Sequence, residues 1–297
     1  MADWVRAPFP AETPVGEAWL LSDHALHASR VTNGPLAGSS IRALMEQRCI
    51  DLLGREAKRF PLLIKLLDAR ENLSVQVHPD DDTAKHLAPE EGGKTEAWHV
   101  LEADPEATIF LGMKPECDRA ALIRAIDDGT APACLHRYHP HPGDSYFVPA
   151  GSIHALGGGV VVLEVQQTSD ATFRLYDWGR VDAAGRPRQL HLDKGLTALR
   201  ELSPSAGRIE ARPIAHRADG EHLVSCPHFH IDRFQLRDRL PLVAPCLWFG
   251  LSGVATVTCS QCTVEVRLGE LALIPACVKD AEVLPQEASE GILIRLG

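Results

Sequence analysis

The 297-residue chain lacks three features that would place a protein at a membrane or on nucleic acid. No apolar run reaches the roughly 18–20 residues that span a bilayer. The N-terminal segment MADWVRAPFPAETPVG has no apolar core of the kind found in signal peptides. The 30 basic residues are outnumbered by 40 acidic ones, a net charge of -10, which disfavours bulk attraction to nucleic acid or anionic lipid. We therefore expect a cytoplasmic protein with no nucleic acid and no membrane among its partners.

Cysteine is too sparse for a disulfide scaffold. The 8 residues are scattered through a long chain, which favours free buried thiols. Only Cys259 and Cys262 are close together, in TCSQCT, between two strand-like runs. A zinc or redox motif of this spacing needs a second cysteine pair or a βα context. The pattern therefore favours a hairpin turn flanked by cysteines.

Helical patterns are few. Residues 39–54 and 118–129 have helical spacing, a Ser or Asp cap and a closing Gly, and a weaker helix is expected near residues 80–91. Elsewhere, 21 Pro and 23 Gly separate short β-branched runs such as TIFLG, SYFVPA, VVVLEVQQ and VATVT. Many short strands between turn signals are typical of β-sandwiches and barrels. We predict a mainly β fold with a small helical insertion.

A partial internal repeat indicates two related barrels. Residues 143–154, GDSYFVPAGSIH, have the spacing G-x5-P-x-G-x2-H. The first part recurs in residues 269–280, GELALIPACVKD, where Asp280 stands in the place of His154. A tight turn into a strand, followed by a proline turn out of it, aims the last side chain into a barrel. Only the first copy aims a histidine.

We place the boundary between the two barrels in the polar stretch near residues 200–220. Residues 1–205 are then predicted to form a catalytic, metal-binding barrel with the helical insertion. Residues 206–297 are predicted to form a non-catalytic barrel.

Polar side chains gather on particular strand faces. LSVQVHPDD (73–81) alternates, so that one face is core and the other carries polar groups, namely Ser74, Gln76 and His78. The core face holds Leu73, Val75 and Val77. In GKTEAWHV (93–100), one face carries Lys94, Glu96 and Trp98. With His154, these segments offer two imidazoles, a carboxylate and an amide, a mixed set that zinc or iron accepts.

An arginine follows on a later strand. Asp170, Thr172, Arg174 and Tyr176 share a face if the strand that contains TFRLY extends back to Asp170. An arginine inside a barrel needs an anionic partner, because a buried unpaired charge is costly. That partner is either a carboxylate or a substrate phosphate, which arginine binds through two parallel hydrogen bonds. The residues alone leave both alternatives open.

Taken together, these motifs resemble the type I mannose-6-phosphate isomerases of the short bacterial form, double-barrel members of the cupin superfamily. The likeness begins at GEAWLLSDH (16–24) and ends at LHLDKGL (190–196), and the C-terminal barrel matches loosely. Between them lie FPLLIKLLDARENLSVQVHPDD, GKTEAWHVL, PGDSYFVPAGSIHALGGG and LEVQQTSDATFRLYDWGR. The expected fold is therefore two cupin-type (jelly-roll) β-barrels.

The resemblance also implies a site. It implies one Zn2+, or another divalent metal, per chain, held by Gln76, His78, Glu96 and His154. Its implied catalytic residues are Arg174 and Lys94, and its implied substrate contacts are Lys65, Ser74 and Asp170. The implied substrate is a small sugar phosphate, and the chain is expected to be a monomer or a weak homo-oligomer.

The implied reaction interconverts mannose 6-phosphate and fructose 6-phosphate. A proton moves between C1 and C2 through a cis-enediol, with the metal as Lewis acid. Lys94, Asp170 or a metal-bound water remain alternative proton carriers.

Two other functions stay open at this point. Metal-binding cupins include oxygenases, in which two histidines and a carboxylate hold Fe(II), although Gln76 and Arg174 argue against this class. A sugar-phosphate sensor without turnover is the other alternative. The intact ligand set and the lack of a recognisable DNA-binding motif argue against it.

Overall fold

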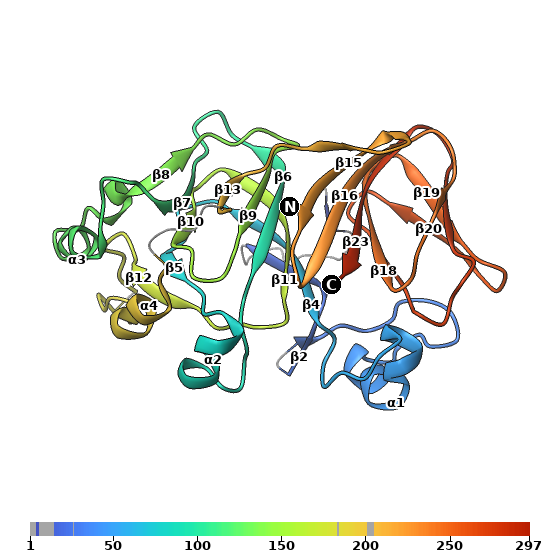
Figure 1. Cartoon of the computed structure of the whole chain (residues 1–297), viewed down its shortest axis with the longest axis horizontal. Coiled ribbons are helices and arrows are strands. Elements are labelled where there is room, and N and C mark those ends of the chain that lie inside the picture. The colour runs from blue at the N-terminus through green and yellow to red at the C-terminus, as the bar shows by residue number, and fades with distance from the viewer. Residues whose placement is uncertain (1–3, 6–14, 26, 183, 201–204) are drawn as a thin grey trace. The chain divides into compact units, whose positions relative to one another are not determined.

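The computed structural model describes residues 4–5, 15–25, 27–182, 184–200 and 205–297. It divides into two compact units (Figure 1). The middle unit is Ile64–Ile209, and the terminal unit combines described residues up to Leu63 with Glu210–Gly297. The predicted boundary after residue 205 directly follows residues 201–204, which lie outside the described residues. The division into a catalytic part, 1–205, and a non-catalytic part, 206–297, stays a prediction.

The middle unit contains two β-sheets. The strand order is β4-β11-β6-β9-β13 in the first sheet and β12-β5-β10-β7-β8 in the second. The strands of the first sheet are β4 (Leu62–Ala69), β6 (Glu96–Ala103), β9 (Ser145–Val148), β11 (Val160–Gln167) and β13 (Gly207–Arg208). Those of the second are β5 (Val75–Val77), β7 (Ile109–Met113), β8 (Leu135–Tyr138), β10 (His154–Leu156) and β12 (Phe173–Tyr176).

Short helices connect these strands: α2 (Asp81–Leu87), α3 (Arg119–Asp127), the 3-10 helix η1 (Ala131–Cys134) and α4 (Leu192–Ala198). The helices predicted near 80–91 and in 118–129 are confirmed as α2 and α3. The Asp118 side chain accepts a hydrogen bond from the Ala121 N–H at 2.7 Å, which caps α3 as expected. Helix α4 was not predicted, because it has no side-chain N-cap and contains Gly195.

The terminal unit also contains two main sheets, both larger than its two-stranded sheet of β2 (Asp23–His24) and β3 (His27–Ala28). Their strand orders are β14-β15-β16-β23-β18-β21 and β17-β22-β19-β20. The first has β14 (Arg212–Ile214), β15 (Arg217–Ser225), β16 (Phe229–Leu236), β18 (Cys246–Ser252), β21 (Leu271–Ile274) and β23 (Ser289–Leu296). The second has β17 (Leu240–Pro241), β19 (Val254–Thr258), β20 (Thr263–Arg267) and β22 (Glu282–Pro285).

The N-terminal part of this unit supplies β1 (Glu17–Leu21), the short strands β2 (Asp23–His24) and β3 (His27–Ala28), and α1 (Ile41–Leu53). Helix α1 confirms the helix predicted in 39–54. The Ser40 side chain accepts a hydrogen bond from the Ala43 N–H, and Gly54 ends the helix at φ 71. That left-handed conformation is one that glycine adopts without strain.

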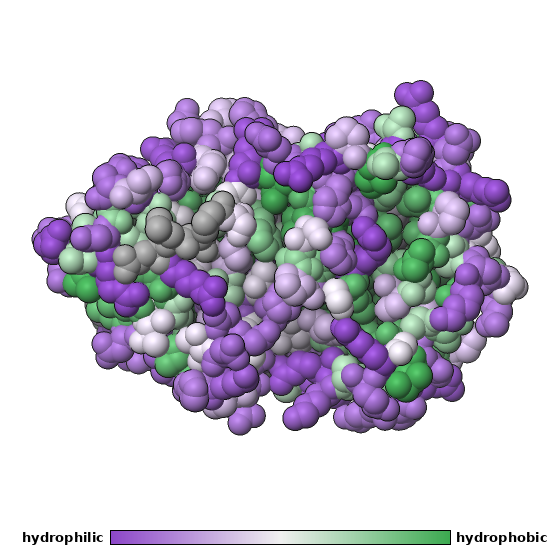
Figure 2. Space-filling model, viewed as in Figure 1, coloured by the Kyte–Doolittle hydropathy of each residue, from purple (hydrophilic) through white to green (hydrophobic). Residues whose placement is uncertain are grey.

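Apolar side chains of alternate strand positions meet between the two sheets of each unit. In the terminal unit, Phe234 and Trp248 from one sheet pack in the same core as Val257 and Val283 from the other. Two facing sheets around one core confirm the predicted jelly-roll architecture. Hydrophilic residues cover most of the surface seen in Figure 2, as expected when the apolar positions are turned inward. Among the described residues, no helix is long and apolar enough to cross a bilayer.

All eight cysteines are free thiols, as predicted. Only Cys134 and Cys246 are buried, so the expectation of burial holds for these two. The hairpin flanked by Cys259 and Cys262 is confirmed, because β19 and β20 pair up to Thr258 and Thr263.

Candidate metal centre

Three neighbouring strands of the middle unit place polar side chains in a row. Gln76 on β5 is the cross-strand partner of His154 on β10 and of Arg174 on β12. Residues directly opposite each other on adjacent strands point to the same face of the sheet. His78 follows the end of β5, and Glu96 begins β6 in the other sheet of the unit. The predicted ligands therefore come from both sheets (Figure 1).

The side chains of His78, Glu96 and His154 converge in the interior. The His78 Nε2 atom lies 3.6 Å from Glu96 Oε2, and the His154 Nε2 atom lies 3.3 Å from Glu96 Oε1. One nitrogen or oxygen atom of each residue lies within 4.8 Å of the others. Each of the three side chains is 1% exposed. Among the described residues, this is the one group of three or more such side chains close enough to share a metal ion.

The outer hydrogen bonds of the two histidines favour metal binding. The Nδ1 atom of His78 lies 2.7 Å from the Ala171 carbonyl oxygen, and that of His154 lies 3.0 Å from the Ser152 carbonyl oxygen. An Nδ1–H that donates to a carbonyl fixes the imidazole orientation and leaves the lone pair on Nε2. Both Nε2 atoms then face Glu96 as potential ligands.

The hydrogen bonds of the three side chains test whether the site fits a metal ion. Among the described residues, none forms a hydrogen bond with His78 Nε2, and the contacts of the Glu96 carboxylate are the longer ion pairs with Lys94 and the two histidines. Buried polar atoms without partners are costly, and in native proteins they indicate a missing ligand, water or ion. Two imidazole nitrogens and a carboxylate suit zinc or iron. These residues therefore fit a divalent metal ion.

Burial sets the charge states of this cluster. Burial holds the pKa of His78 well below its usual value, with a further lowering by Lys94. Burial likewise lowers the pKa of His154 to about 4. Burial raises the pKa of Glu96, while the nearby Lys94 and Lys65 lower it. Both histidines are thus neutral at neutral pH, the form in which imidazole binds metals.

Gln76 reaches the edge of the same cluster. Its Nε2 atom lies 3.2 Å from His154 Nε2, and the Ser74 hydroxyl lies 3.4 Å from its Oε1 atom. Rotation of the amide by half a turn exchanges its nitrogen and oxygen, which would turn the oxygen toward the cluster. The predicted roles of Gln76 as ligand and Ser74 as substrate contact stay predictions.

The two predicted lysines lie among buried carboxylates. The Nζ atom of Lys94, just before β6, lies 3.5 Å from Glu96 Oε2. The Nζ atom of Lys65, on β4, lies 4.0 Å from Glu164 Oε1. Glu164 also accepts a hydrogen bond from Trp98 Nε1 at 2.9 Å, and burial raises the pKa of Glu164, as does Glu96.

Glu164 is not among the site residues predicted from the sequence. Its signal was a lone carboxylate in the apolar run VVVLEV. A charged residue in a buried strand needs a partner, and that requirement makes it a candidate functional residue.

Arg174 shares a carboxylate with two other arginines. Its Nε atom lies 3.9 Å from Asp177 Oδ1, and its Nη1 atom donates to the Gln189 carbonyl at 2.8 Å. Arg180 also pairs with Asp177, and the Arg188 Nη1 atom lies 3.6 Å from Asp177 Oδ1. A carboxylate is therefore present, but three guanidinium groups surround it. Burial lowers the pKa of Arg174, and Arg188 lowers it further.

Asp170 is exposed, and its backbone N–H donates to Glu91 Oε2 at 2.9 Å. The assumption that a strand carries Asp170 and Thr172 was wrong, because β12 begins at Phe173. The Ser169–Thr172 segment instead forms a loop. The predicted substrate contact of Asp170 stays a prediction.

In the second copy of the repeat, Asp280 is exposed and accepts a hydrogen bond from the Ser260 N–H at 2.8 Å. A side chain in the position of His154 thus lies at the surface of the terminal unit.

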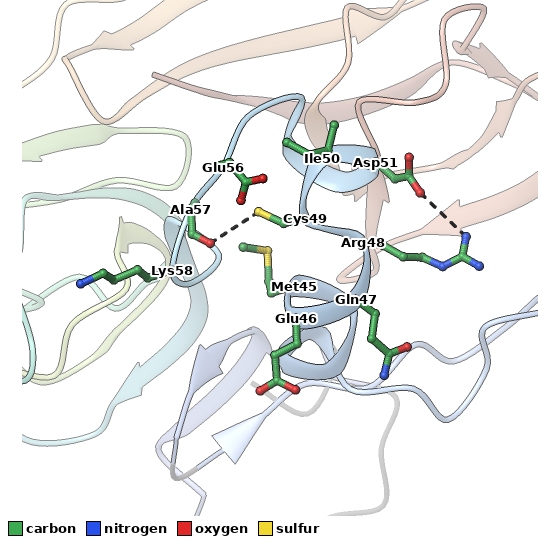
Figure 3. A pocket seen from close by; sticks show the side chains of 10 residues that line it. All are labelled: Met45, Glu46, Gln47, Arg48, Cys49, Ile50, Asp51, Glu56, Ala57 and Lys58. Atoms are coloured by element: carbon green, nitrogen blue, oxygen red, sulfur yellow. Dashed lines mark hydrogen bonds and ion pairs between the residues drawn. The ribbon is translucent and has the colours of Figure 1, made fainter.

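A cavity of about 490 Å³ lies beside α1 in the terminal unit (Figure 3). It is lined by residues 45–51 and 56–58, including the ion pair Arg48–Asp51, whose side chains are each 56% exposed. None of the predicted site residues lines it. We assign the chemistry to the buried cluster instead, because two imidazoles and a carboxylate converge there within reach of one metal ion.

Comparison with known proteins identifies the family of the chain. Residues 1–111 match the family model of the catalytic domain of type I phosphomannose isomerase. The chain is 34% identical to the mannose-6-phosphate isomerase of Streptococcus mutans, with 95% of this chain and 90% of the relative covered. It is 37% identical to a mannose-6-phosphate isomerase of Bacillus subtilis, with 74% of this chain and 70% of the relative covered.

Two further relatives from Bacillus subtilis are 42% and 41% identical, but the match covers only 59% and 58% of their lengths. The crystal structure of the mannose 6-phosphate isomerase from Bacillus subtilis superposes with a TM-score of 0.84 at 31% identity. That superposition covers 95% of this chain and 90% of the other. The predicted family and double-barrel fold are thus confirmed, and the chain belongs to the type I mannose-6-phosphate (phosphomannose) isomerase family.

Proposed function

We propose that the protein interconverts mannose 6-phosphate and fructose 6-phosphate at the buried cluster of the middle unit. The proposal is carried by the convergence of His78, Glu96 and His154 in the interior, where His78 Nε2 has no hydrogen-bond partner among the described residues. It is supported by the two relatives that bear the name of this activity and are covered over 70% and 90% of their lengths. The match with the two Bacillus subtilis relatives of 42% and 41% identity covers only about three fifths of their lengths, so the substrate is part of the proposal.

We infer that Gln76, His78, Glu96 and His154 hold one divalent metal ion, with zinc as the expected metal. Isomerisation requires a proton to leave one carbon of the open-chain sugar and return to its neighbour, while negative charge develops on the oxygens. A bound divalent cation supplies Lewis acidity toward those oxygens. The imidazoles of His78 and His154 and the carboxylate of Glu96 are the protein groups that would hold it.

Lys94 is the residue we assign to proton transfer. It is buried, and its ammonium group lies 3.5 Å from Glu96 Oε2, beside the proposed ligands. Asp170 is a weaker candidate, because it is exposed and its backbone is tied to Glu91. Lys65 lies near Glu164 and adds positive charge to the same interior.

The phosphate is assigned to the arginine cluster around Asp177. Arg174, Arg180 and Arg188 surround this single carboxylate, which leaves a local excess of positive charge in a chain of net charge -10. Arginine binds phosphate oxygens through paired hydrogen bonds. Because Arg174 is the cross-strand partner of Gln76, a phosphate held there would keep the rest of the sugar near the cluster.

Ser74 and Asp170 complete the proposed substrate contacts. We also propose that the protein acts in the cytoplasm as a monomer or weak homo-oligomer. A phosphorylated sugar is charged and does not cross a bilayer unaided, so its isomerase is expected where the phosphate ester is made and used.

The test is a coupled assay on the purified chain. Mannose 6-phosphate is supplied and fructose 6-phosphate is detected, with unphosphorylated mannose as the comparison substrate. We expect turnover of the phosphate ester and at least about a tenfold lower kcat/KM for mannose, because a charged hydrogen-bonding group is lost. Binding of mannose 6-phosphate without turnover would point to a sensor. Oxygen consumption with Fe(II) and no isomerisation would point to an oxygenase.

A further inference from the structure

The hairpin between β19 and β20 brings two thiols together in the terminal unit. Cys259 and Cys262 flank its tip, directly after the cross-strand pair Thr258–Thr263. The Cys259 N–H donates to the Cys262 carbonyl at 2.9 Å, which closes the turn. The two sulfur atoms lie 3.5 Å apart. Cys262 is exposed and Cys259 is partly exposed, so reagents in solution can reach them.

We propose that Cys259 and Cys262 are a redox-active dithiol, which a small-molecule or protein disulfide converts reversibly to an intramolecular disulfide. A disulfide bond is about 2.05 Å long and needs two side chains that face each other. Sulfur atoms at 3.5 Å on a closed turn need only side-chain rotation and a small adjustment of the tip. The sequence pattern by itself favoured a plain hairpin turn, and it is the sulfur–sulfur distance that adds the redox site.

The thiol–disulfide exchange takes place in two steps. The thiolate of Cys259 attacks one sulfur of the incoming disulfide, forms a mixed disulfide and releases the first thiol with the proton that Cys259 gave up. Cys262 then loses its proton and attacks the Cys259 sulfur, which releases the second thiol. Two protein thiols are oxidised to one disulfide, and one external disulfide is reduced to two thiols.

The turn assigns different roles to the two cysteines. The backbone N–H of Gln261 and the Cys262 thiol hold the pKa of Cys259 below its ordinary value by hydrogen bonding, against the opposing effects of burial and Asp280. The pKa of Cys262 is raised, first by its hydrogen bond to Cys259 and then by burial. Cys259 is therefore the attacking thiol and Cys262 the resolving one.

The chain contains its own control pair. Cys117 and Cys134 also interact with each other, but Cys134 is buried. Burial, with Cys117 as the next cause, raises the pKa of Cys134 to about 11. Both pairs therefore contain neighbouring thiols. Only the hairpin pair combines them with access to solvent and a thiol of lowered pKa.

The experiment treats the full-length chain with oxidised glutathione, quenches with acid and alkylates the remaining thiols for peptide mass mapping. The expected result is the loss of two alkylation sites on the peptide that contains Cys259 and Cys262, reversed by dithiothreitol. Cys117 and Cys134 should stay reduced in the same sample. The Cys262→Ser variant should accumulate a stable glutathione adduct on Cys259, and Cys259→Ser should react much more slowly.

Each contrary result would overturn the proposal. One is a hairpin peptide that stays fully reduced while exposed single cysteines such as Cys277 form adducts. Another is faster adduct formation on Cys262 than on Cys259. A third is oxidation of Cys117 and Cys134 at the same rate as the hairpin. Circular dichroism of both serine variants checks that the fold is retained, and no step of the test depends on isomerase activity.

Discussion

Gln76 and His154 are 78 positions apart in the chain, yet they are direct cross-strand partners, and their Nε2 atoms lie 3.2 Å apart. This pairing joins the strand β5, which leads to His78, to the strand β10, which begins at the end of the glycine–proline motif. Glu96 from the other sheet completes the group. Strand register therefore brings the candidate ligands together.

The first prediction concerns a ligand. His154→Ala should abolish stoichiometric metal binding and lower kcat/KM by more than about 100-fold, since even loss of an outer-sphere partner costs 10- to 100-fold. The fold should persist, because the apolar cores of the middle unit remain. Elemental analysis, the isomerase assay and circular dichroism measure the three effects. His136→Ala, at an exposed histidine on β8, is the matched control and should bind metal normally.

The second prediction concerns the phosphate. Arg188→Ala should raise KM for mannose 6-phosphate about tenfold or more with little change in kcat, because a hydrogen bond to a charged group contributes roughly 1.5–3 kcal/mol. Arg186→Ala is the control, since Arg186 is 77% exposed and pairs with Asp182 instead. Steady-state kinetics on both variants decide the matter. Equal effects of the two changes would remove Arg188 from the phosphate site.

The third prediction concerns the segment that follows His78. The Asp80 side chain caps α2 by accepting a hydrogen bond from the Thr83 N–H at 2.7 Å, and it pairs with Arg200. Loss of an N-cap costs about 1 kcal/mol, so Asp80→Ala should lower the free energy of unfolding by that amount at pH 7. Asp80→Asn keeps a side-chain acceptor for the Thr83 N–H, so it should lower the free energy of unfolding by less. Urea unfolding of the three proteins measures the difference.

The same residue gives a pH dependence. Burial raises the pKa of Asp80, but the hydrogen bonds from Thr83 and the charge of Arg200 outweigh it, so the net pKa is lowered. A carboxylate with a lowered folded-state pKa stabilises the fold above its unfolded pKa, which is about 3.9, and the effect is lost as pH falls through the folded value. The stability difference between the wild type and Asp80→Asn should therefore shrink on acidification below pH ~4. A difference that grows on acidification would contradict the assignment.

The fourth prediction concerns the hairpin thiols. Asp280 accepts a hydrogen bond from Ser260, and its carboxylate raises the pKa of Cys259. Asp280→Asn retains an acceptor for Ser260 but removes the charge, so the pKa of Cys259 should fall and its thiolate fraction near neutral pH should rise. The rate at which iodoacetamide labels Cys259 rises with pH, and the midpoint of this rise should shift to lower pH in the variant. Cys246, whose pKa burial raises to about 12, should stay unreactive in both proteins.

The sequence predicted which side chains share a face of β5, because strand alternation is local. Val75 and Val77 are fully buried, and Gln76 shares its side of the sheet with His154, as the pattern of LSVQVHPDD required. The prediction was wrong for Leu73, which is 36% exposed because β5 begins only at Val75. Alternation fixes faces within a strand but does not show where the strand starts.

Contacts between distant segments were harder to predict. The pairing of Lys65 with Glu164 and the approach of Arg188 to Asp177 depend on which strands and loops become neighbours. Arg174 and Arg180, in contrast, each lie only three positions from Asp177. A single sequence contains no signal for those distances. The proximity of the Cys259 and Cys262 sulfurs, in contrast, depends on one short turn, but its side-chain geometry still had to be seen.

The central claim is that the buried cluster binds the metal on which isomerisation depends. The most direct measurement removes metal with a chelator and titrates zinc back, while bound metal and mannose 6-phosphate turnover are recorded in the same samples. We expect activity to disappear with the metal and to return in proportion to zinc, with saturation at one ion per chain. Full activity of a chelated sample with no bound metal would contradict the claim.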